Sequence, residues 1–250
     1  MSALSDVDPF GGRVALVTGA SGGIGQAIAL ALACKGSAVA LGYGANAGAA
    51  ERLAARITSD GGRSVAIGAD LRRREAPREL VAAAESELGP VELLISNAGL
   101  GQTQSLEEVS IECFDETLAA NLRAPFLLAQ RTLPTMRARG FGRVLFMSSV
   151  AAFTGGIVGP HYAASKAGLH GLTHFLAARF ASAGVTVNAL APALIGETGM
   201  LPGDPEELRR RVPVGRLGAP AEVADIALAI LRNPYITNQI VSIDGGMYPR

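Results

Sequence analysis

The sequence predicts a single doubly wound α/β domain with a seven-stranded parallel sheet flanked by helices. Short apolar runs and helical patterns alternate about seven times along the 250 residues. A glycine turn joins the first apolar run to the first helical pattern. The composition, with 49% hydrophobic residues and 31 glycines, suits a parallel sheet with tight turns better than an all-β or disulfide-stapled protein. The chain is also long enough to bury a sizeable core.

The elements are predicted from short local patterns. Strands are expected where brief apolar runs lie between glycines or polar residues, and helices where Ala-rich and Leu-rich segments repeat with a helical period. The domain is expected to span residues 12–250, after a disordered or loosely docked tail at residues 1–11. The expected strands are residues 14–18, 37–43, 64–69, 91–96, 144–147, 185–190 and 239–243, and the expected helices include residues 23–35, 106–136 and 220–232.

Tyr162 and Lys166 are four residues apart in a segment whose composition favours helix, so they are expected to share a helix face. An ammonium group beside a phenol lowers the phenol's pKa, and such a tyrosine can exchange a proton with a carbonyl or alcohol oxygen near neutral pH. Ser149, at the end of the neighbouring strand, could hydrogen-bond the same oxygen. The alternative is a buried tyrosine on an ordinary helix with a solvated lysine one turn away.

The glycine turn carries the second signal. Gly19, Gly23 and Gly25 lie between the first strand and the first helix, within the sequence TGASGGIG. Backbone N–H groups in such a turn can approach a pyrophosphate, whose charge is favoured at a helix N-terminus. The turn therefore predicts a dinucleotide site.

Ser149, Tyr162 and Lys166 at their spacing, together with the TGASGGIG turn, resemble the short-chain dehydrogenase/reductase family over residues 12–247. Within the family the sequence is most similar to the 3-oxoacyl-[acyl-carrier-protein] reductases, through YAASKAGL, VPVGRLG and IDGGM. The resemblance implies a Rossmann fold in which Tyr162 protonates a ketone oxygen, Ser149 orients it, and Lys166 lowers the pKa of Tyr162 and binds the ribose hydroxyls. It also implies that Asn121 kinks its helix and holds a water of a proton relay.

The resemblance implies a set of cofactor contacts as well. Asp70 would meet the adenine amino group, although it could instead cap the following helix. An inserted Gly196 leaves the register of Thr198 open. Besides Tyr162 and Lys166, the implied cofactor-binding residues are Gly19, Ser21, Gly23, Ile24, Gly25, Tyr43, Asp70, Leu71, Asn97, Ala98, Gly99, Pro192, Ile195 and Thr198.

The expected cofactor is NADP(H), with NAD(H) as the alternative. In dinucleotide folds an acidic residue about 20 residues beyond the glycine turn commonly selects NAD. Tyr43 and Gly44 occupy that place here, and the nearest acid is Glu51. No carboxylate is therefore placed to repel a 2′-phosphate, although no basic residue lies between Leu41 and Ala50 to bind one.

Composition excludes several other classes. The formal net charge is zero and the Arg72–Arg74 run is interpreted as solvated surface, so no nucleic-acid partner is expected. The sequence has neither a signal-peptide pattern nor an apolar span of about 18 residues, which predicts a cytoplasmic protein without membrane contact. Cys34 and Cys113 are interpreted as small core residues. His170 and His174 lack a third ligand, so no metal is expected.

The expected activity is NADPH-dependent reduction of a ketone, most simply of a 3-oxoacyl thioester in fatty acid biosynthesis, by a homotetramer. Acyl carrier protein is a candidate partner. However, the docking arginines of that branch would align with Gly140 and Ala183, and only Arg139 could substitute. A small ketone, a coenzyme A thioester or a polyketide intermediate is therefore an alternative substrate. A non-catalytic NADP(H)-binding sensor is the alternative from a different class.

Overall fold

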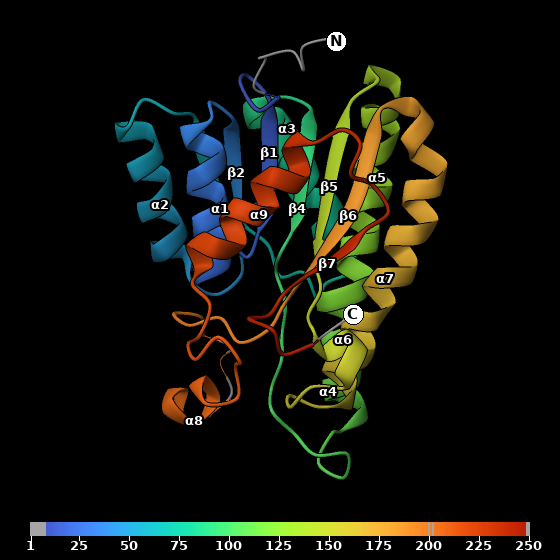
Figure 1. The fold of residues 1–250 in the computed structure, drawn as a ribbon. Helices are drawn as coiled ribbons and strands as arrows, with labels where there is room; N and C mark the ends of the chain where they lie inside the picture. The colour runs from blue at the N-terminus through green and yellow to red at the C-terminus, as the bar shows by residue number, and fades with distance from the viewer. Residues whose placement is uncertain (1–8, 200, 202, 249–250) are drawn as a thin grey trace, which may run out of the picture.

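Seven strands form one fully parallel sheet in the order β3-β2-β1-β4-β5-β6-β7 (Figure 1). The structure is a computed structural model that describes residues 9–199, 201 and 203–248. The predicted fold class is confirmed, and each strand lies within two residues of its predicted bounds. The strands are β1 (Val14–Thr18), β2 (Ala38–Tyr43), β3 (Ser64–Gly68), β4 (Val91–Ser96), β5 (Gly142–Met147), β6 (Val185–Pro192) and β7 (Ile240–Ile243).

Helices cover both faces of the sheet. One face carries α1, α2 and α9, and the other carries α3, α5 and α7, while the short α6 and α8 lie near the carboxyl ends of the strands (Figure 1). The helices are α1 (Gly23–Cys34), α2 (Ala47–Ser59), α3 (Ala76–Leu88), α4 (Ile111–Leu118), α5 (Ala124–Arg139), α6 (Ala151–Thr154), α7 (Pro160–Phe180), α8 (Pro205–Arg209) and α9 (Pro220–Arg232), with a π-helical turn at Ala119–Arg123 and a 3₁₀ turn at Ala181–Ala183.

The side chains of β1 show why its sequence is a continuous apolar run. Ala15 and Val17 pack in the core beneath α1, α2 and α9, whereas Val14 and Leu16 pack in the core beneath α3, α5 and α7. Successive residues of a strand point to opposite faces, so a strand buried on both faces needs apolar residues at every position.

The chain reverses direction across the sheet after β3. From β1 it moves outward through β2 and β3, and it then crosses back to place β4 on the other side of β1. Loops leaving β1 and β4 therefore diverge and open a crevice at the carboxyl ends of these strands, which is where open α/β sheets bind their ligands. Of the residues expected to bind a cofactor, the glycine turn follows β1, and Asn97, Ala98 and Gly99 follow β4.

The predicted helix at residues 106–136 is interrupted. Residues 106–110 form a turn and loop, and α4 begins only at Ile111, where the Ser110 hydroxyl accepts a hydrogen bond from the Cys113 N–H. The π-helical turn Ala119–Arg123 then separates α4 from α5. It inserts a wider hydrogen-bonded turn at Asn121, which periodicity alone could not locate.

Two further expectations need correction. Phe10 is buried in the core and its carbonyl accepts a hydrogen bond from the Ser37 hydroxyl, so the packed domain begins earlier than the predicted boundary at residue 12. The remainder of the predicted tail, residues 1–8, lies outside the described residues. The prediction that both cysteines are core residues is wrong, because Cys34 ends α1 with its side chain exposed and Cys113 is only partly buried. Within the described part of the chain, no helix is both long and apolar enough to cross a membrane.

Candidate active site

A cavity of about 840 Å³ runs along the carboxyl ends of the strands. Ser149 and every residue expected to bind a cofactor line it, from Tyr43 and Asp70 at one end to Tyr162 and Lys166 at the other. Asn121 does not line the cavity and lies behind its wall. Several lining residues were not predicted from the sequence: Thr18, Gly22, Arg72, Leu100, Ile157, Val158, Leu194 and Leu201.

Tyr162, Lys166 and Ser149 lie together at one end of the cavity. The tyrosine and lysine are one turn apart on α7, with the Lys166 Nζ 5.6 Å from the centre of the Tyr162 ring. The Ser149 hydroxyl, just beyond β5, forms a hydrogen bond with Tyr162. The Lys166 Nζ donates to the Met147 carbonyl at 2.8 Å, and the Ser148 Oγ donates to the Lys166 carbonyl at 3.0 Å. These bonds fix α7 to the end of β5.

The pKa values differ from the sequence-based expectation. Burial raises the pKa of Tyr162 above its usual value of 10, and the hydrogen bond with Ser149 only partly opposes this. Burial also lowers the pKa of Lys166 to about 8. The predicted lowering of the Tyr162 pKa by Lys166 is therefore wrong for this arrangement of side chains, because desolvation of the buried phenol dominates and the Lys166 Nζ donates to the Met147 carbonyl instead. Tyr162 keeps its proton at neutral pH, as a proton donor must.

The lowered pKa of Lys166 predicts a specific dependence of stability on pH. Between pH 8 and about 10.5 the unfolded chain holds a proton on Lys166 that the folded chain has lost, so the free energy of unfolding rises with pH by up to about 1.4 kcal/mol per unit. Lys166→Met lacks this dependence. In urea unfolding at pH 7.5, 8.5 and 9.5, the stability of wild type relative to Lys166→Met is expected to increase with pH. A constant difference would contradict the lowered pKa.

Asn121 joins three segments behind the cavity wall. Its side chain is fully buried, accepts from the Leu100 N–H at 2.7 Å, and donates to the Leu100 carbonyl at 2.8 Å and the Ser165 Oγ at 3.0 Å. A buried amide needs such partners. Its Oδ1 and the Lys166 Nζ both lie close to Gly99, at 3.4 and 3.2 Å from the position of an added Cβ. The structure thus brings Asn121 near Lys166, and its role in a proton relay remains a prediction.

The glycine turn meets the requirements of an anion site. Gly22 caps the N-terminus of the twelve-residue α1 without a side-chain hydrogen bond, and the first turn of α1 contains no acidic residue. The free N–H groups and the helix dipole favour a phosphate there. The Asn97 Nδ2 donates to the carbonyls of Thr18 and Gly19 at 3.0 and 3.3 Å, which ties the ends of β1 and β4 together beside the turn.

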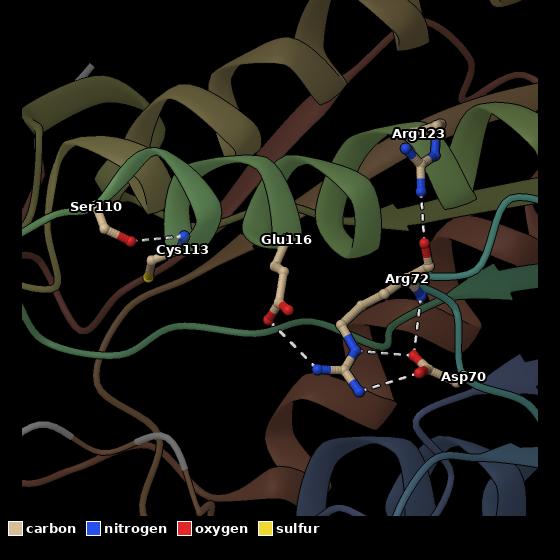
Figure 2. A network of polar contacts seen from close by, with 6 residues as sticks. All are labelled: Asp70, Arg72, Ser110, Cys113, Glu116 and Arg123. Atoms are coloured by element: carbon tan, nitrogen blue, oxygen red, sulfur yellow. Dashed lines mark hydrogen bonds and ion pairs between the residues drawn. The ribbon is translucent and has the colours of Figure 1, made fainter.

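The end of the cavity opposite Tyr162 carries a carboxylate, Asp70, and a guanidinium, Arg72. Asp70 lines it and accepts hydrogen bonds from Arg72, whose charge holds the pKa of the carboxyl below its usual range (Figure 2). The alternative that Asp70 caps a helix is excluded, because α3 begins at Ala76 after Glu75. Asp70 is the only acidic residue among the described lining residues. Arg72 is exposed, as the sequence-based interpretation expected, with 47% of its side chain accessible, and it also lines the cavity. Its place in the cavity lining was not predicted, although its position two residues after a strand-end aspartate was an available signal.

The loop after β6 completes the cavity wall. Pro192, Ile195 and Thr198 all line it, and the Thr198 hydroxyl donates to the Ile195 carbonyl at 2.9 Å. The inserted Gly196 therefore does not remove Thr198 from the cavity. The Gly196 N–H donates to the Gly218 carbonyl, which ties this loop to the segment before α9.

The histidines lie on α7 near this site. His161 is fully buried, the His170 Nε2 lies 2.9 Å from the Ser148 Oγ, and the His174 Nδ1 lies 2.6 Å from the Asn238 Oδ1. Within the described residues, no group of three or more His, Cys, Asp or Glu side chains could hold a metal ion.

A doubly wound sheet with a tyrosine, a lysine and a serine at the end of a nucleotide-sized crevice defines an oxidoreductase. The chain belongs to the short-chain dehydrogenase family, whose family model, described as "short chain dehydrogenase", matches residues 13–208. It is 37% identical over 243 residues to an acetoacetyl-CoA reductase of Rhizobium meliloti, covering 94% of this chain and 98% of that protein.

Two further comparisons agree with this assignment. The chain is 34% identical to a 3-oxoacyl-[acyl-carrier-protein] reductase of Synechocystis, covering 94% of this chain and 96% of that protein. A solved structure of a blue fluorescent protein from a metagenomic library, in complex with NADPH, superposes with a TM-score of 0.89 at 34% identity. That superposition covers 96% of this chain and 99% of the other. The predicted family is confirmed.

Proposed function

We propose that this protein is an NADPH-dependent reductase that converts a ketone, most simply the 3-oxo group of an acyl thioester, into a secondary alcohol. The observation that carries the proposal is the meeting of Ser149, Tyr162 and Lys166 at one end of the cavity, with the helix N-terminus of the glycine turn along its floor. A non-catalytic sensor would need the cavity but not this set of side chains.

The residues present have the chemistry that a ketone reduction requires. The cofactor, when bound, would supply the hydride to the carbonyl carbon. Tyr162, which keeps its proton at neutral pH, donates that proton to the developing alkoxide oxygen. Ser149 donates a hydrogen bond to the same oxygen and stabilises its charge. Lys166, whose Nζ donates to the Met147 carbonyl, would bind the ribose hydroxyls of the cofactor.

The lining favours NADP(H) over NAD(H). Tyr43 ends β2, and Gly44 and Ala45 follow it, where a discriminating carboxylate would lie; none of these described lining residues is acidic. Solved relatives in complex with NADPH and with NADP support the choice. Ser21 and the glycine turn would hold the phosphates, Asp70 and Leu71 the adenine, and Pro192, Ile195 and Thr198 the nicotinamide.

The thioester is the proposed substrate because the cavity lining includes the apolar side chains of Leu100, Ile157, Val158, Leu194 and Leu201, which suit an acyl chain. The names of the two similar reductases reported above describe enzymes that reduce such thioesters. One observation favours a substrate without a carrier protein. The positions that align with the docking arginines are Gly140 and Ala183, which carry no charge, and the neighbouring Arg139 shares the buried Glu92 carboxylate with Arg13, at 3.4 Å from it.

A comparison of substrates and cofactors tests this proposal. We expect wild type to oxidise NADPH in the presence of acetoacetyl-coenzyme A. At equal subsaturating cofactor concentrations, the rate of NADPH oxidation should be at least tenfold higher than the rate of NADH oxidation. Turnover of acetoacetyl-carrier protein should be no faster than turnover of the coenzyme A ester, because Arg139 already pairs with Glu92. Turnover of simple ketones alone would replace the thioester by a small carbonyl substrate. Tight NADPH binding without turnover of any carbonyl compound would favour the sensor.

A further inference from the structure

Arg72 is a cation at the adenosine end of the cavity, and the proposed reaction gives it no role. Its side chain lines the cavity, and it forms an ion pair with Asp70 beside it and with Glu116 on α4 (Figure 2). Arg73, the next residue, pairs with Glu79 and does not line the cavity. Of these two neighbouring arginines, only Arg72 is built into the site.

The hydrogen bonds from Arg72 occupy most of the Asp70 carboxylate. Oδ1 accepts from the Arg72 Nε at 2.9 Å and from the Arg72 backbone N–H at 3.1 Å, while Oδ2 accepts from the Arg72 Nη2 at 3.0 Å. An ionised carboxylate offers about four acceptor sites, two on each oxygen. The arrangement therefore leaves one acceptor site, on Oδ2, for a single donor from outside.

Arg72 is itself held from two other segments. Its Nη1 donates to the Glu116 carboxylate at 3.3 Å, and its backbone carbonyl accepts from the Arg123 Nη2 at 2.5 Å (Figure 2). Glu116 lies on α4 and Arg123 ends the π-helical turn that contains Asn121. Glu116 thus orients the guanidinium and, through it, the Asp70 carboxylate, while Arg123 holds the Arg72 backbone from a second segment remote in sequence.

We propose that Arg72 is a positioning residue for base recognition: it fixes Asp70 so that one carboxylate oxygen accepts a single N–H, which selects a purine with an amino group at carbon 6. This inference rests on the proposed function, because it takes Asp70 as the residue that faces the adenine. A purine with a carbonyl at carbon 6 would place its carbonyl oxygen against the Asp70 carboxylate oxygen, and two acceptors cannot form a hydrogen bond. A fixed carboxylate discriminates against it, whereas a rotating one can turn away.

The test compares NADPH with its hypoxanthine analogue, in which a carbonyl oxygen replaces the amino group. Dissociation constants of both are measured by fluorescence titration for wild type, Arg72→Gln, Arg72→Lys and the matched control Arg73→Gln. Wild type is expected to bind NADPH about tenfold more tightly than the analogue. Arg73→Gln should keep this ratio. In Arg72→Gln the ratio of the two dissociation constants should fall toward one. It should also fall in Arg72→Lys, because lysine keeps the charge but lacks the planar guanidinium that binds the carboxylate at two points.

Several results would overturn the inference. Equal weakening of both ligands by Arg72→Gln would make Arg72 a general contact or a purely structural residue. An unchanged ratio in Arg72→Lys would show that charge matters rather than orientation. Equal binding of both ligands by wild type would remove Asp70 as the reader of the amino group, while the proposed reductase function would stand. Failure of wild type to bind NADPH would instead contradict the proposed function itself.

Discussion

Tyr162→Phe is expected to lower turnover with NADPH and acetoacetyl-coenzyme A by about 10²- to 10⁴-fold, the range of a lost general acid. The hydroxyl is the only part removed, and the ring remains between Ser149 and Lys166. The dissociation constant for NADPH should therefore change little. Steady-state rates measured at saturating NADPH, together with a fluorescence titration of the cofactor, separate the chemical step from binding.

The matched control for this variant is Tyr235→Phe, because Tyr235 is 94% exposed and lies before β7, outside the residues that line the cavity. Its turnover should equal that of wild type. If Tyr162→Phe retained more than a tenth of wild-type turnover, the proton would have another source and the role given to Tyr162 would be wrong.

Gly25→Ala is expected to have the largest effect on stability. A Cβ at Gly25 would overlap the Gly19 carbonyl oxygen and lie 2.8 Å from the Asn97 Nδ2, so the turn and the end of β4 would both have to move. Such overpacking costs about 1–3 kcal/mol. The gain from replacing glycine in a helix is at most about 1 kcal/mol, so the clash should dominate. Because Gly19 and Asn97 border the cavity, NADPH binding should weaken as well.

Gly22→Ala is the matched control within the same turn. A Cβ at Gly22 would have the Gly19 carbonyl oxygen as its nearest neighbour at 3.5 Å, an ordinary contact. Its backbone is extended, with φ of −95°, which any residue adopts. Urea unfolding should therefore show a clear loss for Gly25→Ala and a smaller one for Gly22→Ala, which only replaces a favoured N-cap residue. Equal unfolding midpoints for the two variants would contradict the close packing of the turn.

Much of the fold follows from the sequence, because a strand buried on both faces has a distinctive pattern. Val14–Thr18 and Val91–Ser96 are short and wholly buried, and their predicted bounds match the structure. Periodicity could not locate the π-helical turn at Asn121, since it depends on bonds from Asn121 to Leu100 and Ser165, which are remote in sequence; only the family resemblance implied a kink there.

The relative positions of site residues could be predicted where sequence spacing fixes them. Properties that depend on burial or on partners remote in sequence could not. Tyr162 and Lys166 share a face because they are four residues apart on a helix. Their pKa values, however, depend on desolvation by the surrounding chain, and the sequence alone favoured the opposite direction for Tyr162. The local signal for Arg72 was its partner Asp70 two residues away, whereas its second partner, Glu116, is 44 residues away and could not be predicted.

The most direct test of the proposed reaction follows the hydride itself. Wild type is incubated with acetoacetyl-coenzyme A and NADPH carrying deuterium at both positions of nicotinamide carbon 4, and the product is analysed by mass spectrometry. A 3-hydroxyacyl thioester with one deuterium on carbon 3, absent from the Tyr162→Phe reaction over the same time, is the expected result. Product without deuterium, or no product from enzyme that binds NADPH, would contradict the proposal that this site transfers hydride to a 3-oxoacyl thioester.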